Sequence, residues 1–305
     1  MKIAVTGSSG FLGRTLCRAL EARGDTLVQI HTRNCDLTRA GTLESMATDS
    51  YEVIYHLAAW TQAGDFCLHH PGEQWIVNQQ INTQVLAWWS HKQPQAKMVF
   101  MGTSCAYAPG CRHTESEYMV GEPIDSLYTY AMTKRMLYQG ARALNRQYGL
   151  RYLCAVPSTL YGPDYHTDGR QIHFIFDLMR KIIRGKELGE PVVLWGSGHQ
   201  KRELVHVQDF VDTLLVLVPT MDNDLINIGA VEDHSIRYFA SVICRIVGFD
   251  EARIHYDELR YVGATSKRLD IAKLRSRLPN YRTIPLEAGL TSCIEWYYST
   301  RAYLT

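Results

Sequence analysis

The N-terminal segment constrains the fold more than any other part of the chain. A short apolar run at residues 3–6 leads directly into the glycine-rich turn Gly7-Ser8-Ser9-Gly10-Phe11-Leu12-Gly13, and an amphipathic stretch, Phe11–Ala22, follows. Glycines in such a turn let the backbone bend sharply and approach a pyrophosphate, which then lies at the positive N-terminus of the next helix. A strand, a glycine turn and a helix in this order predict a dinucleotide-binding unit.

Strand-like and helix-like stretches alternate through the first half of the chain. Further apolar, β-branched runs lie at 27–31, 53–57, 98–101 and 152–156, with amphipathic stretches at 73–89 and 130–148. Strands that alternate with helices imply right-handed crossovers and a doubly wound parallel sheet covered on both faces. We therefore expect an α/β fold of the Rossmann type, with residues 1–160 forming the cofactor-binding domain.

The pattern of predicted helices and strands changes after Gly162-Pro163. Longer helical patterns at 172–183, 236–247 and 286–298 accompany short strands at 192–195 and 225–228. This pattern predicts a smaller C-terminal α/β lobe for the substrate, formed by residues 161–202 and 231–305. Residues 203–230 are expected to return to the first domain.

Composition excludes several classes of partner. The 305 residues carry 32 Lys and Arg against 31 Asp and Glu, so the net charge of +1 gives no reason to expect nucleic acid or an anionic membrane. No apolar run approaches the roughly 18 residues of a membrane helix. The eight cysteines form no Cys-x-x-Cys pair, which indicates reduced thiols in a cytoplasmic protein, and no metal site is expected because His69 and His70 are adjacent.

The end of the second predicted strand indicates which dinucleotide is bound. Arg33 stands where NAD-binding proteins usually place an acidic residue, and a guanidinium is a natural partner for a 2′-phosphate. Asp36 lies further along the chain and is expected to face the adenine. The prediction is NADP(H).

Three residues predict proton transfer to a sugar oxygen. Tyr130 and Lys134 are one helical turn apart and share a face, and the lysine is expected to lower the phenol pKa. Thr103 follows the apolar run 98–101, at the end of a strand where α/β sites lie, and its hydroxyl can bond the same oxygen.

With these motifs the chain resembles the extended short-chain dehydrogenase/reductase family, also called the NAD-dependent epimerase/dehydratase family, and most closely its GDP-L-fucose synthase branch. The likeness covers nearly the whole chain and rests on residues 32–33, 102–107, 130–134, 157–163, 193–198, 202–207 and 227–229. The resemblance implies an enzyme that epimerises a GDP-linked 4-keto-6-deoxy sugar at C3 and C5 and reduces C4 with NADPH.

The resemblance also assigns an epimerisation pair. It implies that Cys105 and His173 are the base and acid that exchange protons beside the ketone, since a 4-keto group acidifies the neighbouring C–H bonds. Related dehydratases carry an Asp-Glu pair after the threonine, whereas Ser104-Cys105 stand here, which disfavours dehydration. A 4-epimerase or a simple 4-ketoreductase stays an alternative, and a non-catalytic NADP-binding regulator is a remote one.

Further ligand contacts are implied by the same resemblance. The remaining cofactor residues are Leu37, Leu57, Ala58, Ala59, Pro157 and Leu160, with Lys134 and His173 also contributing. The substrate residues are Lys181, Trp195, Arg202 and Lys267, three cations and an aromatic plane that suit a nucleoside diphosphate. The helix at 73–89 and the helix that carries Tyr130 are expected to pair with their copies in a homodimer.

The chain departs from the family at several positions near the sugar. The family's glycine-rich loop is replaced by residues 60–65, its basic residue within the glycine turn by Ser9, and its Asn after the Pro-Thr pair by Thr159. The approach to Lys267 is altered at residues 262–265. Another 6-deoxy-4-keto sugar, or a heptose, is therefore compatible with the sequence.

Overall fold

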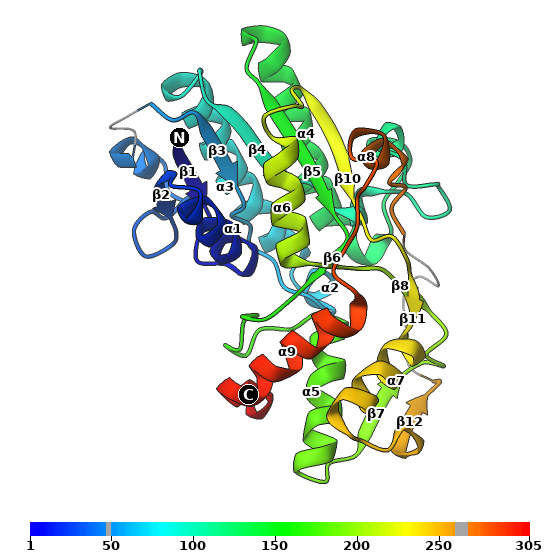
Figure 1. Cartoon of the computed structure of the whole chain (residues 1–305). Helices are drawn as coiled ribbons and strands as arrows, with labels where there is room; N and C mark the ends of the chain where they lie inside the picture. Colours follow the sequence, from blue (N-terminus) through cyan, green and yellow to red (C-terminus); the bar gives the residue numbers. More distant parts are fainter. Residues whose placement is uncertain (47–49, 260–267) are drawn as a thin grey trace.

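The computed structural model describes residues 1–46, 50–259 and 268–305, so that Lys267 lies outside the described residues. Six parallel strands form the central sheet in the order β10-β5-β4-β3-β1-β2 (Figure 1). Their bounds are β1 Lys2–Thr6, β2 Thr26–Ile30, β3 Val53–His56, β4 Lys97–Met101, β5 Tyr152–Pro157 and β10 Asp224–Ile228. The strand order reverses between β1 and β3, and in open α/β sheets such a point marks the ligand crevice.

Helices cover both faces of this sheet. On one face α1 (Phe11–Ala22) packs beside α6 (Val207–Leu217), and on the other α3 (Pro71–Lys92) packs beside α4 (Tyr128–Tyr148). Strands β3 and β4 are buried along their whole length because helices cover them on both sides. In α3, Trp88 and Trp89 are buried and belong to the core of the sheet.

A second, smaller core lies below the sheet in Figure 1. It contains the helices α5 (Phe174–Glu187), α7 (Ile236–Val247) and α9 (Leu286–Thr300). Short paired strands border it or join it to the sheet domain: β6 (Thr159–Tyr161) with β9 (Leu204–His206), β7 (Val192–Trp195) with β12 (Ile254–Asp257), and β8 (Lys201–Arg202) with β11 (His234–Ser235).

The chain passes repeatedly between the two cores. Residues 205–230 contribute to the first core and β10 pairs with β5, whereas Ile236 to Ile254 contribute to the second. Leu269, Ile271 and Leu274, which introduce or belong to α8 (Ala272–Arg277), return to the first core. The predicted boundary puts residues 231–305 in the second lobe, whereas the apolar side chains of this stretch belong to the first core and α8 lies against β10.

The predicted fold class is confirmed, and the main sheet and long helices lie close to the predicted ranges. The sequence did not predict β6, β8, β9, β11 or β12, which have only two to four residues each. Runs of that length carry no usable period, so only their long-range partners define them as strands.

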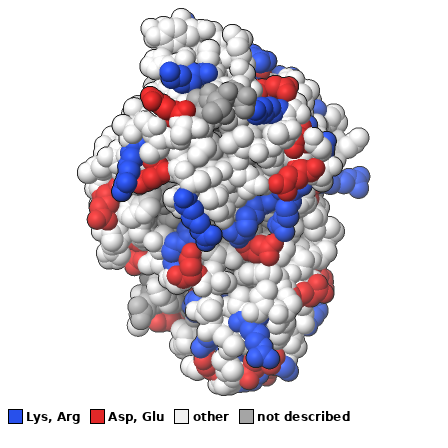
Figure 2. All heavy atoms as spheres, turned by 90° about the vertical axis from the view of Figure 1, so that its left-hand side faces the viewer, with Lys and Arg blue, Asp and Glu red and all other residues white. Residues whose placement is uncertain are grey.

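On the face shown in Figure 2, Lys and Arg side chains are interspersed with Asp and Glu. An anionic ligand bound at this face must therefore be held by particular residues. Among the described residues, none of the helices is both long and apolar enough to cross a bilayer. In the same ranges no three His, Cys, Asp or Glu side chains are grouped to hold a metal ion.

Candidate active site

The glycine turn forms a close-packed cradle at the N-terminus of α1. Gly7 has a φ of +68°, and a Cβ there would lie 2.7 Å from the backbone nitrogen of Ala58. A Cβ on Gly13 would lie 2.2 Å from the carbonyl oxygen of Gly7. The helix N-cap is Gly10, which offers no side chain to the first N–H groups. These donors therefore stay available for an anion, as a pyrophosphate requires.

Residues within the glycine turn and at the start of α1 contact both cores of the molecule. Ser8 is buried and its hydroxyl donates to the carbonyl of Ile30 at 3.3 Å, whereas Ser9 is exposed. Phe11 packs edge-on against Tyr165 at 5.1 Å, which connects the turn to the second core. Leu12 packs against the first core.

The end of β2 presents a cation. Arg33 is exposed, and within the described ranges its guanidinium has no ion pair or hydrogen bond. Asp36 accepts from the hydroxyl of Thr38 at 2.7 Å, and this bond lowers the pKa of its carboxyl group. Leu37 is buried. Arg33 is therefore the available group for a 2′-phosphate. The Asp36 carboxylate instead accepts hydrogen bonds within its own turn.

The other predicted cofactor residues lie at the same edge of the sheet. Leu57, Ala58 and Ala59 follow β3 and are half-buried, and the N–H of Ala58 donates to Thr6 Oγ1 at 3.2 Å. Pro157 ends β5 and Leu160 lies in β6, both half-buried. The carboxyl ends of β1, β2, β3 and β5 thus bring these residues together.

Thr103, Tyr130 and Lys134 converge beside this edge. Thr103 follows β4, is buried, and hydrogen-bonds the Tyr130 side chain. Lys134 is also buried, and no carboxylate in the described chain pairs with it. A buried ammonium without a counter-charge is costly unless a ligand supplies partners.

The protonation of this group differs from the sequence prediction. Burial, and secondarily Cys105, raises the pKa of Tyr130 well above its usual range, although the bond with Thr103 lowers it. The expected lowering by Lys134 is wrong for this structure, because removal from water dominates. Burial also lowers the pKa of Lys134 to about 8. The phenol is therefore neutral near pH 7, so it has a proton to donate.

A buried polar chain that the sequence analysis missed lies next to Lys134. His56 contacts Thr6 Oγ1 through Nδ1 at 2.8 Å and Asn82 Oδ1 through Nε2 at 3.2 Å. Asn82 donates to the carbonyl of Thr133 at 3.3 Å. Burial, followed by the charge of Lys134, lowers the pKa of His56 to about 4. This neutral chain joins β1 and β3 to the helix that carries Tyr130 and Lys134.

The proposed epimerisation residues come from different regions. Cys105 lies half-buried in the short 3₁₀ helix η2 (Ser104–Ala106), and its N–H donates to Thr103 Oγ1 at 3.2 Å. Its thiol is close enough to raise the pKa of Tyr130. His173 is exposed and is the N-cap of α5, with its ring 6.3 Å from that of Tyr165.

The predicted substrate residues are differently disposed. Lys181, on α5, forms an ion pair with Asp177 at 2.8 Å, so its charge is already partnered. Trp195 ends β7 with 55% of its surface exposed. Arg202 lies in β8, and burial lowers the pKa of its guanidinium. Lys267 falls outside the described ranges.

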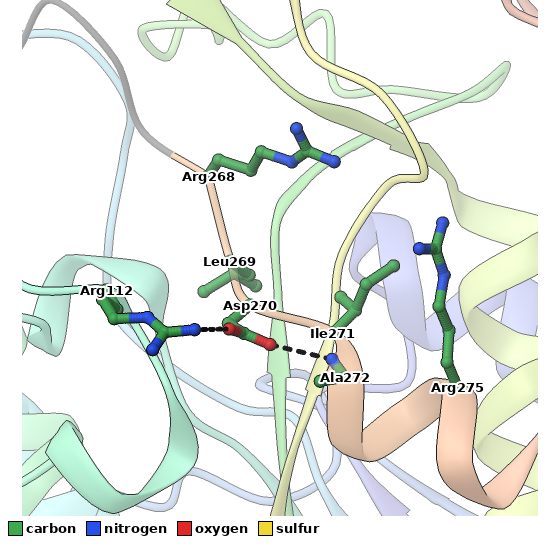
Figure 3. A pocket seen from close by; sticks show the side chains of 7 residues that line it. All are labelled: Arg112, Arg268, Leu269, Asp270, Ile271, Ala272 and Arg275. Atoms are coloured by element: carbon green, nitrogen blue, oxygen red, sulfur yellow. Dashed lines mark hydrogen bonds and ion pairs between the residues drawn. The ribbon is translucent and has the colours of Figure 1, made fainter.

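An open hollow of about 610 Å³ lies apart from the predicted catalytic residues. In Figure 3, Arg112, Arg268 and Arg275 surround it, and Arg112 points toward Asp270, 3.5 Å away. Asp270 also caps the N–H of Ala272 at 2.8 Å. None of the predicted site residues lines this hollow, so it is not the predicted active site.

Comparisons with known proteins identify the family. The model of the NAD dependent epimerase/dehydratase family matches residues 3–229. GDP-L-fucose synthase 1 of Arabidopsis thaliana is 30% identical over 302 residues, covering 97% of this chain and 93% of that protein. GDP-L-fucose synthase of Escherichia coli K12 is 28% identical over 315 residues, covering 97% and 96%. The family resemblance inferred from the motifs is confirmed.

A solved structure supports the fold. A GDP-L-fucose synthetase from Naegleria fowleri bound to NADP superposes with a TM-score of 0.86 at 21% identity, covering 98% of this chain and 94% of the other. At this identity the likeness concerns the fold, and both cores are included in it.

Proposed function

This chain belongs to the NAD dependent epimerase/dehydratase family, and from that premise we propose that it is an NADPH-dependent epimerase/reductase of a GDP-linked 4-keto-6-deoxy sugar. The GDP-L-fucose synthases among its relatives support a nucleotide sugar as substrate. The observation that carries the proposal is the grouping of Thr103, Cys105 and a neutral Tyr130 beside the uncompensated Lys134.

The residues present fit NADP(H). The close-packed glycines leave no room for side chains where a pyrophosphate would approach, and the first turn of α1 offers free N–H groups. Arg33 would hold the 2′-phosphate. Lys134 would donate to ribose hydroxyls, which gives its buried charge the partners it lacks in the protein. When bound, the nicotinamide supplies the hydride for C4.

The side chains divide the chemistry between two tasks. Cys105 and His173 would remove and return protons at the carbons beside the ketone, inverting one or both centres. Tyr130, neutral because it is buried, would donate its proton to the C4 oxygen, and Thr103 would hold that oxygen by a hydrogen bond. Trp195 and Arg202 would contact the nucleotide, with the indole on a ring and the guanidinium on phosphate.

The decisive experiment uses a GDP-4-keto-6-deoxy sugar with NADPH in heavy water. Loss of absorbance at 340 nm reports reduction, and mass spectrometry reports deuterium gained at carbon. Both signals together support the proposal. Reduction without deuterium at C3 or C5 would instead identify a 4-ketoreductase, and an absence of both would overturn the proposal.

The proposal includes a homodimer in the cytoplasm. A shallow groove of about 380 Å³ between α3 and α4 is lined by small and apolar residues, such as Ala87 and Gly140, together with polar ones, such as His91 and Gln147. Ile76, 57% exposed, lies on the α3 face that borders this groove. A second copy would cover this face. All eight cysteines are free thiols, as a reducing compartment favours.

A further inference from the structure

The loop at residues 60–65 is bound at its tip by a residue more than a hundred positions away. Both backbone polar groups of Gln171 hydrogen-bond this loop. Its N–H donates to Gln62 Oε1 at 3.1 Å, and its carbonyl accepts from the N–H of Ala63 at 3.4 Å. Its side-chain amide donates to Asp65 Oδ1 at 2.6 Å. These three bonds make a clasp, which we define as Gln62, Asp65 and Gln171.

The clasp is closely fitted. Gly64, between its two loop members, has a φ of +66°, and a Cβ there would lie 2.2 Å from the Oε1 of Gln171. The Gln171 side chain therefore lies directly on the loop backbone. The bond from Gln171 is also the largest cause that lowers the pKa of Asp65. The carboxylate is thus the charged acceptor that makes such a bond strong.

One end of the loop is fixed to the cofactor side of the site. Asn78 of α3 accepts from the N–H of Trp60 and donates to its carbonyl, both at 2.9 Å. At the other end the loop enters α2 (Phe66–His69), and the thiol of Cys67 is close enough to Cys105 and Tyr130 to influence the pKa of Tyr130. The loop thus connects the surroundings of Cys105 with the clasp.

The other side of the clasp leads to His173. Gln171 is two residues before His173, the N-cap of α5, and the carbonyl of His173 accepts from the N–H groups of Phe176 and Asp177 at 3.0 and 3.2 Å. The position of His173 is therefore set by α5 behind it and by Gln171 in front of it.

We propose that Gln171 is a positioning residue and that the clasp sets the separation between Cys105 and His173, the two proton-transfer groups on either side of the 4-keto sugar. This inference rests on the proposed function. Proton transfer requires donor and acceptor within hydrogen-bond reach of the carbon acid, and a misplacement of about 1 Å can cost about a hundredfold in rate. The clasp would thereby determine which sugar carbon is inverted.

The test exchanges the donor and the acceptor. In Gln171→Glu two carboxylates face each other, so we expect a ten- to hundredfold loss in the rate of solvent deuterium exchange into the 4-keto sugar. The NADPH affinity should change far less than the exchange rate. Asp65→Asn should have a small effect, because an amide oxygen still accepts. The double variant Asp65→Asn with Gln171→Glu restores the bond in reverse, and its exchange rate should recover.

The matched control is Arg170→Ala, which changes the neighbouring exposed residue. Among the described residues its guanidinium hydrogen-bonds only Asp168, at 2.9 Å, so the exchange rate should not change. Wild-type exchange by Gln171→Glu, or a double variant as impaired as Gln171→Glu alone, would overturn the inference. If the wild-type protein exchanges no deuterium, the proposed function is wrong and the inference about Gln171 is wrong with it. If the wild-type protein does exchange deuterium, the variants test the inference about Gln171 alone.

Discussion

The cofactor side and the sugar side of the site are built in different ways. On the cofactor side, backbone geometry within a few residues makes the cradle, as the contact between Gly13 and the Gly7 carbonyl shows. On the sugar side, side chains from distant segments meet, as Gln171 does with Asp65. A local motif therefore identifies the cofactor class, whereas under the proposed function the sugar class would depend on long-range pairs such as this one.

The largest expected effect is a loss of hydride transfer when the proposed proton donor, Tyr130, is removed. Tyr130→Phe removes the phenol that would protonate the C4 oxygen, so hydride transfer should fall about 10²–10⁴-fold. Deuterium exchange at the neighbouring carbons should persist. Single-turnover oxidation of NADPH measures hydride transfer, and mass spectrometry in heavy water measures deuterium exchange. An equal loss in both would mean that the two sides do not act separately.

The converse variant is Cys105→Ser. A serine hydroxyl is a much poorer base than a thiolate, so exchange should fall by at least about a hundredfold. NADPH binding, followed by fluorescence titration, should not change. If this variant exchanges deuterium at the parent rate, Cys105 has no role in epimerisation and a ketoreductase becomes the better description.

The cofactor side can be tested alone with Arg33→Ala. Charged hydrogen bonds contribute roughly 1.5–3 kcal/mol, so NADPH affinity should fall about ten- to a hundredfold while NADH affinity stays the same. Calorimetric titration with both cofactors gives the comparison. Equal affinity of the unmodified protein for NADH and NADPH would contradict the assignment of this residue.

Lys134 should make the ligand-free protein less stable. Its pKa is about 8 in the folded chain against an ordinary 10.5. Between these values the unfolded chain holds the extra proton, so stability should rise with pH through this window. At pH 7, Lys134→Met should raise the free energy of unfolding by about 3 kcal/mol, and the gain should shrink as pH approaches 10.5. Urea denaturation of both proteins at pH 7 and near pH 10 measures the gain in the free energy of unfolding. A gain that does not depend on pH would mean that the substitution acts through packing and not through the charge.

The smallest effect on catalysis is expected at the proposed dimer face. Ile76→Glu places a charge on the exposed face of α3 beside the groove, so a dimer should dissociate while activity per chain changes less than about twofold. Light scattering at micromolar concentration reports the mass. A strictly monomeric unmodified protein would remove the dimer from the proposal.

Much of the cofactor side could be predicted from the sequence, because its signals are local. The glycine turn and the one-turn spacing of Tyr130 and Lys134 need no tertiary information. The ion pair of Lys181 with Asp177 also has a local signal, because the two residues are four positions apart on one helix. The direction of the Tyr130 pKa could not be predicted, since it depends on burial.

Long-range contacts account for the rest. Gln62 and Gln171 are 109 positions apart, and nothing near either residue indicates the other. His56 had a weaker signal: it stands level with Thr6 in the paired strands β1 and β3, so two polar groups end adjacent buried strands. Recognising that pair requires knowledge of the strand register, which the sequence alone does not provide.

The place of β10 in the sheet has a consequence for how this protein can be made and divided. This strand covers the edge of β5, yet about seventy residues separate the two, and many of them build the other core. During synthesis from the N-terminus, the edge of β5 therefore stays open until Asp224–Ile228 leave the ribosome. A fragment cut near residue 160 would keep that buried strand as an exposed, aggregation-prone edge. The cofactor-binding half thus contains its motifs, but we expect it not to fold as an independent unit without β10.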